Sequence, residues 1–357
     1  MNCEKSNSVK DLVCEFNSLY EAMEKSAAGV RWKDSVQGFY NNAFDKLIKL
    51  QKSLYDGTYK ISKYTHFTVY EPKERDILAT RFKDRVFQRS LCDNYLYDEI
   101  TRHFIADNCA CQKGKGTEYA RYRIEDHLRS FYFHNDNSNN GYVLKIDIKN
   151  YFGSTSHEVA KNAIRKRVRN RWARKMVYDV IDSYEGDRGM GLGSQLVQLI
   201  QLSVLDDLDH YIKEQLHIKY YVRYMDDMIL IHPDKEYLKW CLRKIKDKLE
   251  KLELKVNKKK TQVFPIKQQF TFLGMTVGLT KTGKVKFHVV KSKLINEERR
   301  LKKMVKRAKK GKMTKEDVDF CFRCYKGYIK NTQKHVKRST KDAIEYLDKF
   351  YDNLWAV

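Results

Sequence analysis

Two adjacent aspartates, Asp226 and Asp227, stand in the middle of a segment otherwise suited to a buried β-hairpin. Residues 220–222 (YYV) and 228–231 (MILI) are strand formers on either side of the pair. Two acids between buried strands are costly unless a cation lies beside them. The hard cation Mg²⁺ prefers carboxylate oxygens together with substrate phosphates, so the segment predicts a metal-dependent site. An ordinary acidic hairpin turn is the alternative.

A third aspartate has a similar setting. Asp147 follows the apolar strand start at 142–146 (YVLKI). Two divalent ions held by such acids about 4 Å apart can activate a 3′-hydroxyl and stabilise a leaving pyrophosphate. Three acids in such settings suit two-metal chemistry of this kind.

The hydrophobic periodicity predicts a mixed α+β chain. Residues 141–148, 219–230, 270–279 and 285–290 have strand character, and apolar residues recur at helical spacing between them. The expected order is an antiparallel sheet backed by helices. Further expected elements are helices over 8–56, 158–183, 195–215, 235–252 and 291–357, and strands within 59–70.

The charge balance points to a polyanionic partner. Lys plus Arg number 71 and Asp plus Glu 46, which gives a net charge of +25. A basic excess of this size favours nucleic acid as the partner. No uncharged run approaches the roughly 20 residues of a membrane-spanning helix, and the N-terminus has no signal-peptide character. We expect a cytoplasmic protein with no membrane partner.

The sequence around the acids resembles that of the reverse transcriptases. Residues 224–227 (YMDD) resemble that family's YxDD box, and residues 145–152 (KIDIKNYF) resemble its first palm motif. Further matching stretches follow the family's order and extend the resemblance over roughly residues 30–335. They are 70–75 (YEPKER), 81–88 (RFKDRVFQ), 111–117 (CQKGKGT), 257–261 (NKKKT) and 272–274 (FLG).

This resemblance implies an α+β right-hand polymerase fold with fingers, an antiparallel palm sheet and a helical thumb. The implied domains are an N-terminal helical extension at 1–57, fingers with part of the palm at 58–140, a palm at 141–290 and a thumb at 291–357. The implied activity is synthesis of DNA on an RNA template.

The resemblance also implies catalytic roles for the acids. Asp147 and Asp226 would bind two Mg²⁺ ions, with Mn²⁺ as the alternative ion. The backbone carbonyl of Ile148 would complete one site, and Asp227 would be a supporting ligand. Lys260 is a candidate proton donor to pyrophosphate, or alternatively one member of a solvated run of lysines.

Nucleotide contacts are implied as well. Lys73 and Arg75 would hold the triphosphate of the incoming dNTP, since Arg and Lys both suit phosphate. Phe152 would exclude a ribose 2′-hydroxyl, with Tyr151 as the competing candidate. Gly193 ends a box, residues 190–193 (MGLG), where the family pattern is Leu-Pro-Gln-Gly.

That box departs from the family pattern. Leu192 replaces the Gln that contacts the nucleotide, unless the register shifts so that Gln195 or Gln198 takes its place. This departure leaves fidelity and nucleotide choice open.

Template and primer contacts are expected from basic and turn residues. Positive charge interleaved with aromatic side chains suits a thumb that grips a duplex by its phosphates. The candidates are Lys113, Lys115, Phe272, Gly274, Lys302, Lys303 and Lys306. The primer is expected to be DNA or RNA.

Within the family, the motif sequences most resemble those of bacterial enzymes of two kinds. One kind copies a dedicated noncoding RNA in antiphage defence, and the other diversifies a target gene as part of a retroelement. We favour defence because of the altered box at 190–193. A template-independent polymerase and a non-catalytic RNA-binding protein are further alternatives, and an accessory protein or homo-oligomer is a potential partner.

Overall fold

The computed structural model describes residues 9–70, 74–191, 193–332 and 337–356. Its described part is a mixed helix and sheet fold with antiparallel strand pairs, which confirms the predicted α+β class. Strands form a two-stranded, a four-stranded and a three-stranded sheet.

The chain divides into two compact units, and each unit is built from segments that alternate along the sequence. Unit 1 comprises Met1–Gly116, Lys145–Ile229 and Trp240–Gln262. Unit 2 comprises Thr117–Leu144, Leu230–Lys239 and Val263–Val357.

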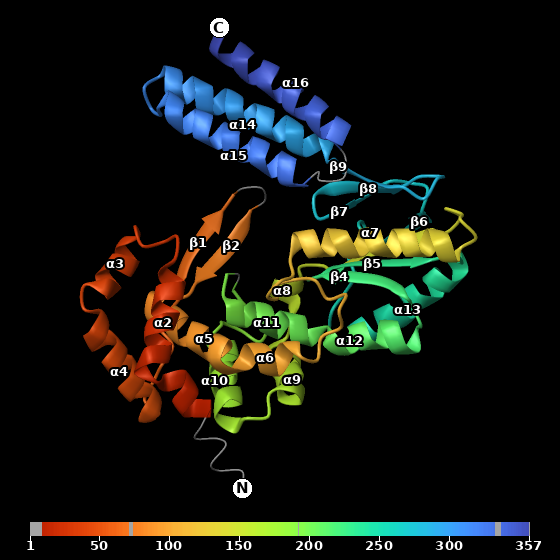
Figure 1. Ribbon diagram of the computed structural model, residues 1–357. Helices are drawn as coiled ribbons and strands as arrows, with labels where there is room; N and C mark the ends of the chain where they lie inside the picture. The colour runs from red at the N-terminus through yellow and green to blue at the C-terminus, as the bar shows by residue number, and fades with distance from the viewer. Residues whose placement is uncertain (1–8, 71–73, 192, 333–336, 357) are drawn as a thin grey trace. The chain divides into compact units, whose positions relative to one another are not determined.

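Helices at the N-terminus form one side of unit 1, as the period of three and four predicted (Figure 1). Helix α2 packs along α5, which explains why Leu19 and Met23 are buried. The predicted helical segment 8–56 contains α2 (Phe16–Ala27), α3 (Asp34–Tyr40) and α4 (Ala43–Tyr55). Helix α5 (Phe82–Leu91), the π-helical turn η1 (Cys92–Leu96) and α6 (Tyr97–Thr101) lie where no helix was predicted.

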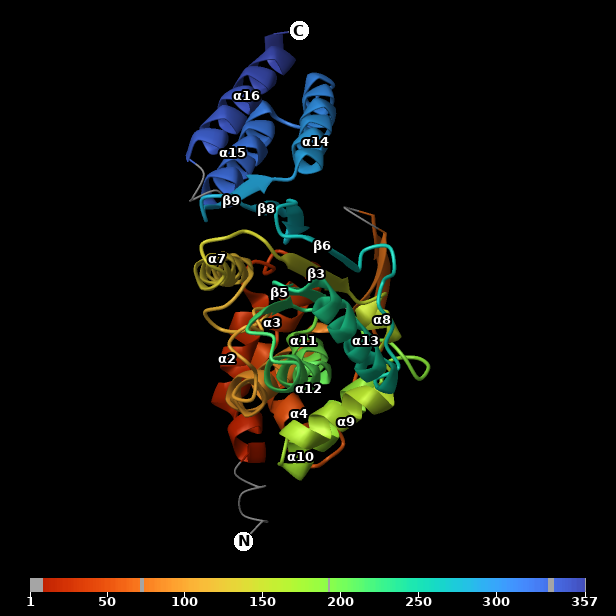
Figure 2. The ribbon, with the colours of Figure 1, turned by 90° about the vertical axis from the view of Figure 1, so that its right-hand side faces the viewer.

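Helix α11 (Gln195–Val204) is buried along almost its whole length, and it contacts α5 and α6. Helix α9 (His157–Arg167) contacts both α11 and α10 (Arg171–Asp182), and Figure 2 shows α9 beside α10. The single helix expected over 195–215 is instead three pieces. Leu205 leaves the helical conformation after α11. Helix α12 (Asp206–His210) and the π-helix η2 (Tyr211–Gln215) follow it.

Strands β1 (Thr65–Val69) and β2 (Arg75–Ala79) form an antiparallel hairpin in unit 1. The strand expected within 59–70 therefore covers only its second half, and β2 is its partner.

The four-stranded sheet has the order β4-β5-β3-β6. Its members are β3 (Tyr142–Asp147), β4 (Tyr220–Tyr224), β5 (Asp227–His232) and β6 (Gln262–Pro265). Strands β4 and β5 are adjacent, which confirms the hairpin predicted at 219–230. Helix α13 (Lys235–Lys251) follows β5, and the short α8 (Tyr151–Ser154) follows β3.

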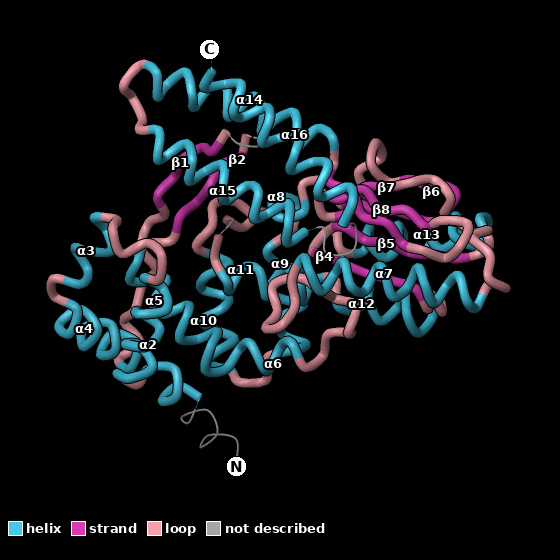
Figure 3. The backbone as a smooth tube through the Cα atoms, turned by 45° about the horizontal axis from the view of Figure 1, so that its top comes forward, coloured by secondary structure: helices cyan, strands magenta, loops and turns pink. Residues whose placement is uncertain are grey.

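In unit 2, the three-stranded sheet has the order β7-β8-β9, and Figure 3 shows β7 beside β8. Its strands are β7 (Phe270–Phe272), β8 (Met275–Leu279) and β9 (Val285–Val289). A single strand over 270–279 does not form because Leu273 and Gly274 both have positive φ and turn the chain back. Helix α7 (Thr117–His134) contacts β9.

The basic C-terminal helices of unit 2 are α14 (Lys291–Lys309), α15 (Lys315–Thr332) and α16 (Lys337–Ala356). They pack pairwise around a shared core that includes Leu301, Val318 and Leu347. In the described part of the chain, every helix is too short or too polar to cross a bilayer.

Candidate active site

The three predicted acids lie in unit 1 at the ends of neighbouring strands. Asp147 is the last residue of β3, and Asp227 is the first of β5, which is its neighbour in the sheet. Asp226 lies in the tight turn between β4 and β5. Met225 forms this turn with a φ of 55°, in the left-handed region that non-glycine residues rarely adopt.

The acids share one electrostatic environment. Burial raises the pKa of Asp226 to about 6, and the charges of Asp227 and Asp147 add to this rise. Burial also raises the pKa of Asp227, with Asp147 again adding to the rise while Lys145 and Lys260 oppose it. Burial and neighbouring carboxylates therefore disfavour the negative charge of Asp226 and Asp227, as expected for groups that are completed by a cation.

Lys260 supplies positive charge at Asp147. Its Nζ atom donates a hydrogen bond to Asp147 Oδ2 over 2.6 Å, and this bond raises the pKa of Lys260. The lysine side chain is about half exposed, whereas Asp147 is buried. The sequence left Lys260 between a functional role and a solvated lysine run, and the structure brings it to the acids.

The segment that carries Lys260 is fastened to the end of β3. Asn257 N donates to the Asp147 carbonyl oxygen over 2.7 Å, and Asp147 N donates to Thr261 Oγ1 over 3.3 Å. Ile148 is buried and forms an isolated bridge with Val256. Sequence reasoning missed the supporting part of Thr261, although it belongs to a matched motif.

The donor set is of the kind that suits a hard divalent ion, because three carboxylates meet the oxygen preference of Mg²⁺ and Mn²⁺. Among the described residues, no group of three His, Cys, Asp or Glu side chains converges tightly enough to enclose an ion. The acids thus suit a divalent ion by the chemistry of their oxygen donors and by their shared negative charge.

Phe152 and Tyr151 have different environments. Tyr151 is buried, and its hydroxyl donates to the carbonyl oxygen of Gln201 over 2.5 Å. Phe152 is only half-buried and packs edge-on against the Tyr151 ring, with the centroids 5.8 Å apart. Of the two rings, Phe152 is the one accessible to a nucleotide sugar.

The glycine box is held against the segment that follows β3. Gly189 N donates to Thr155 O over 2.9 Å, and Met190 N donates to Phe152 O over 3.1 Å. Gly193 has a φ of 106° and open space where a side chain would be. Leu192 lies outside the described residues, so the register of the box stays a prediction.

The fingers candidates are only partly described. Arg75 begins β2, where its backbone pairs with Val69. Lys73 lies outside the described residues.

The two lysines of the 111–117 motif have internal contacts. Lys113 Nζ lies 4.5 Å from the centroid of the Tyr97 ring. Lys115 Nζ donates to the carbonyl oxygens of Ala106 and Asn108 over 3.2 and 3.0 Å. Lys115 therefore stabilises its own loop.

The remaining nucleic-acid candidates lie in unit 2. Phe272 is fully buried, and Gly274 has a φ of 75° at a position where a side chain would displace the Lys293 ammonium. The α14 lysines Lys302, Lys303 and Lys306 are exposed. Lys302 and Lys306 line an open groove of about 440 Å³ together with Lys309 and Lys310.

Comparison with known proteins gives one family. Residues 73–277 match the family model described as reverse transcriptase (RNA-dependent DNA polymerase). A search of curated proteins returned no match to the chain.

A search of solved structures returned telomerases among its matches. A telomerase from Candida albicans in complex with a TWJ fragment of telomeric RNA is 12% identical, with a TM-score of 0.49 over 74% of this chain and 55% of that one. An apo telomerase from Candida tropicalis is 14% identical, with a TM-score of 0.49 over 64% and 49%. The chain spans about half the length of these two structures.

Proposed function

Because the chain belongs to the reverse transcriptase family, we propose that it is an RNA-directed DNA polymerase whose catalytic acids are Asp147, Asp226 and Asp227. The observation that carries this proposal is the placement of three carboxylates at the ends of neighbouring strands. Burial there raises the pKa of Asp226 to about 6, and the charges of Asp227 and Asp147 add to the rise. Such repulsion is a cost that bound cations would remove.

In this proposal Asp147 and Asp226 hold two Mg²⁺ ions, and Asp227 and the carbonyl group of Ile148 assist. Bound ions would activate the primer 3′-hydroxyl and neutralise charge on the leaving pyrophosphate. Mn²⁺ would serve as the alternative ion, since it prefers the same oxygen ligands.

Lys260 is proposed to neutralise Asp147 before the nucleotide binds and to donate a proton to the leaving pyrophosphate. Its hydrogen bond to Asp147 raises its pKa and keeps the ammonium protonated at neutral pH. A protonated group beside the leaving oxygen is what general acid catalysis requires.

The incoming dNTP is proposed to lie against Phe152 and Gly193, with its triphosphate held by Lys73 and Arg75. The half-buried ring of Phe152 supports its assignment as the group that excludes a 2′-hydroxyl. Gly193 leaves space where a side chain would project, which supports close approach of a substrate.

Contacts to template and primer are proposed for Lys113 and Lys115 of unit 1 and, separately, for Gly274 and the α14 lysines of unit 2. The buried Phe272 would act indirectly, by supporting the turn that carries Gly274. The exposed lysines of α14 suit phosphates without reading sequence. Lys115 would act indirectly, by shaping the loop that its ammonium group fastens.

For the biological role we propose antiphage defence in the bacterial cytoplasm, with a dedicated noncoding RNA as template. The support is the motif wording and the altered box at 190–193. Diversification of a target gene is the alternative, and sequencing the RNA and cDNA that copurify with the protein distinguishes the two.

A primer-extension assay tests the proposed activity. The purified chain is given an RNA template, a DNA primer, dNTPs and Mg²⁺, and extended products are resolved by length. Extension that requires the template and stops at its 5′ end supports the proposal. Products of equal length without template would identify a template-independent polymerase, and RNA binding without extension would identify a non-catalytic protein.

A further inference from the structure

Arg223 is fully buried in β4, two residues before Met225. We propose that Arg223 and its partner Asp209 form a positioning pair that fixes the Met225 turn and thereby places Asp226 and Asp227. This inference rests on the proposed catalytic role of those acids. The sequence signal is a lone arginine in an otherwise apolar and aromatic strand, residues 220–225 (YYVRYM).

Arg223 on β4 forms a buried ion pair with Asp209 on α12. Arg223 Nε donates to both carboxylate oxygens of Asp209, over 2.7 Å to Oδ1 and 2.9 Å to Oδ2. The Tyr221 hydroxyl donates to the same Oδ1 atom over 2.7 Å. Asp209 is also fully buried, so this carboxylate fixes the guanidinium in one orientation.

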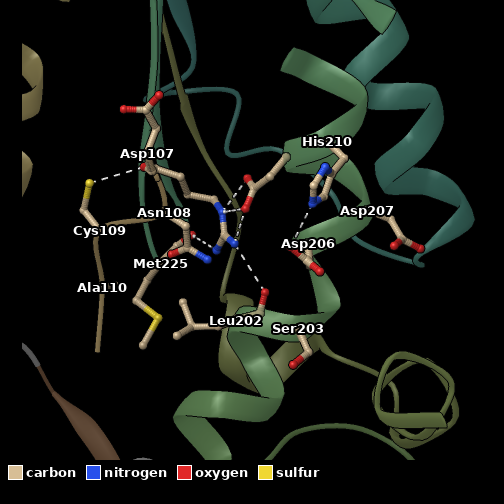
Figure 4. Close-up of polar contacts among 12 residues, drawn as sticks. Asp107, Asn108, Cys109, Ala110, Leu202, Ser203, Asp206, Asp207, His210 and Met225 are labelled. Carbon is tan, nitrogen blue, oxygen red and sulfur yellow. Dashed lines mark hydrogen bonds and ion pairs between the residues drawn. The ribbon is translucent and has the colours of Figure 1, made fainter. Parts of the chain in front are cut away.

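The other nitrogens of the guanidinium reach backbone carbonyl groups. Nη1 donates to Met225 O over 3.1 Å, and Nη2 donates to Leu202 O at the end of α11 over 3.3 Å (Figure 4). The Met225 carbonyl belongs to the strained residue that precedes the two acids. A donor fixed at this carbonyl stabilises a left-handed backbone that would otherwise cost free energy.

The backbone of Arg223 is fixed independently. Its N–H donates to the Asp107 carbonyl oxygen over 2.9 Å, and its own carbonyl oxygen accepts from Cys109 N over 2.9 Å. Residues 107–109 thus hold the strand while α12 holds the side chain. Because its backbone and its guanidinium are both fixed, Arg223 can hold the Met225 carbonyl group at a defined position.

Stability alone is a weak reason for this arrangement. Replacing a buried ion pair with apolar side chains is often neutral or stabilising, so a buried pair is not by itself an aid to folding. An apolar replacement cannot supply the hydrogen bonds to the Met225 and Leu202 carbonyl groups, and of these the bond to Met225 acts on the turn.

A neighbouring ion pair provides a matched control. Asp206 lies on the same helix as Asp209, is equally buried and pairs with Arg167 over 2.7 Å. Figure 4 shows Asp206 beside His210, in the same close-up as Met225. Arg167 pairs with Asp206 and Asp207, which both lie on α12 rather than in the turn.

The test compares Arg223→Lys with Arg167→Lys. Lysine keeps the charge beside each aspartate but loses the planar fork that reaches two partners. We expect Arg223→Lys to reduce kcat for single-dNTP addition about 10- to 100-fold, since small displacements of catalytic groups cost this much. KM for dNTP should stay within about twofold, and Arg167→Lys should leave kcat within about twofold.

A second measurement needs no DNA synthesis. Amide hydrogen exchange is followed by mass spectrometry on peptides covering residues 224–228. Arg223→Lys should accelerate exchange at the turn about tenfold or more while peptides from α10 and α13 stay unchanged, and Arg167→Lys should leave the turn unchanged.

Each outcome decides the proposal. Equal losses of kcat in both variants, or wild-type kcat and turn exchange in Arg223→Lys, would overturn it. If Arg223→Lys shows no cooperative unfolding, Asp209→Asn takes its place, and a folded Asp209→Asn protein with wild-type exchange at the turn overturns it. A wild-type protein without polymerase activity would refute the proposed function, whereas the exchange comparison would still decide whether Arg223 fixes the turn.

Discussion

The Lys260 ammonium lies 2.6 Å from the Asp147 carboxylate, although the two residues are 113 positions apart in the sequence. Lys260, in the loop between α13 and β6, thus contacts Asp147 at the end of β3. The contact joins residues 257–261 to residues 145–152, two segments that match family motifs. Because Lys260 has this contact, its mutation can be compared with mutation of a neighbouring lysine.

Removing a catalytic acid should abolish DNA synthesis. We expect Asp226→Asn and Asp147→Ala to reduce the extension rate about 10³-fold or more, because stabilisation of transition-state charge by a metal amounts to several kcal/mol. Single-turnover extension on a primed RNA template measures the rate. Asp187→Asn, at an exposed carboxylate, is the control. An Asp226→Asn protein with wild-type rate would remove this residue from the catalytic group.

Lys260→Met should slow chemistry rather than binding. The expected loss in kcat is about 10²- to 10⁴-fold, the usual range for a general acid, with KM for dNTP nearly unchanged. Lys258→Met is the matched control because Lys258 is exposed in the same run. Equal small effects in the two variants would mean that the run is only a solvated surface.

Phe152→Val should relax sugar selection. The smaller side chain leaves space for a 2′-hydroxyl, so incorporation of rNTP relative to dNTP should rise. Competition between rATP and dATP at one template position measures the ratio. If Tyr151→Val relaxed the ratio and Phe152→Val did not, the buried ring rather than the accessible one would be the gate.

Replacing the α14 lysines should reduce the salt dependence of RNA binding. Each phosphate contact contributes roughly 0.7–0.9 to the log–log slope, so Lys302, Lys303 and Lys306 changed together to Ala should flatten it by about two to three units. Filter binding across a salt series measures the slope. Arg243, Lys244 and Lys246 of α13, also exposed, supply the control triple.

An unchanged slope in the α14 triple variant would place the duplex elsewhere. The alternatives from the sequence are Lys113, Lys115 and the basic run at 165–174. Lys166 and Arg167 in that run already pair with Asp207, which lowers their capacity for phosphate.

The buried carboxyl of Asp206 should make stability fall as the pH rises. Burial raises the pKa of Asp206 from 3.8 to about 6, against the attraction of Arg167. The folded state therefore holds a proton that the unfolded chain has released, and the free energy of unfolding decreases between about pH 4 and pH 6. Relative to Asp206→Asn, the loss should approach about 3 kcal/mol. Urea unfolding across this range measures it, and parallel pH profiles of the two proteins would contradict the assignment.

Local pattern predicted the parts of the fold that local chemistry determines. The hairpin around Asp226 and the end of β3 at Asp147 follow from strand formers that flank acids. The same reasoning joined 195–215 into one helix, because apolar spacing does not report the break at Leu205.

The supporting contacts of the site were beyond a sequence pattern. Arg223 and Asp209 are 14 residues apart and meet only when β4 packs against α12. The bond between Lys260 and Asp147 likewise needs the fold of unit 1. The sequence could name Lys260 as a candidate but could not decide between a functional contact and a solvated side chain.

The alternation of segments between the two units limits how such a chain can be shuffled. Unit 1 ends at Gln262, after two excursions into unit 2, so no single cut leaves both units whole. Recombination between two related chains at one crossover would therefore combine fragments of at least one unit from different parents. A split version of the protein would face the same problem, and its halves would have to complete a unit from both polypeptides before either could become stable.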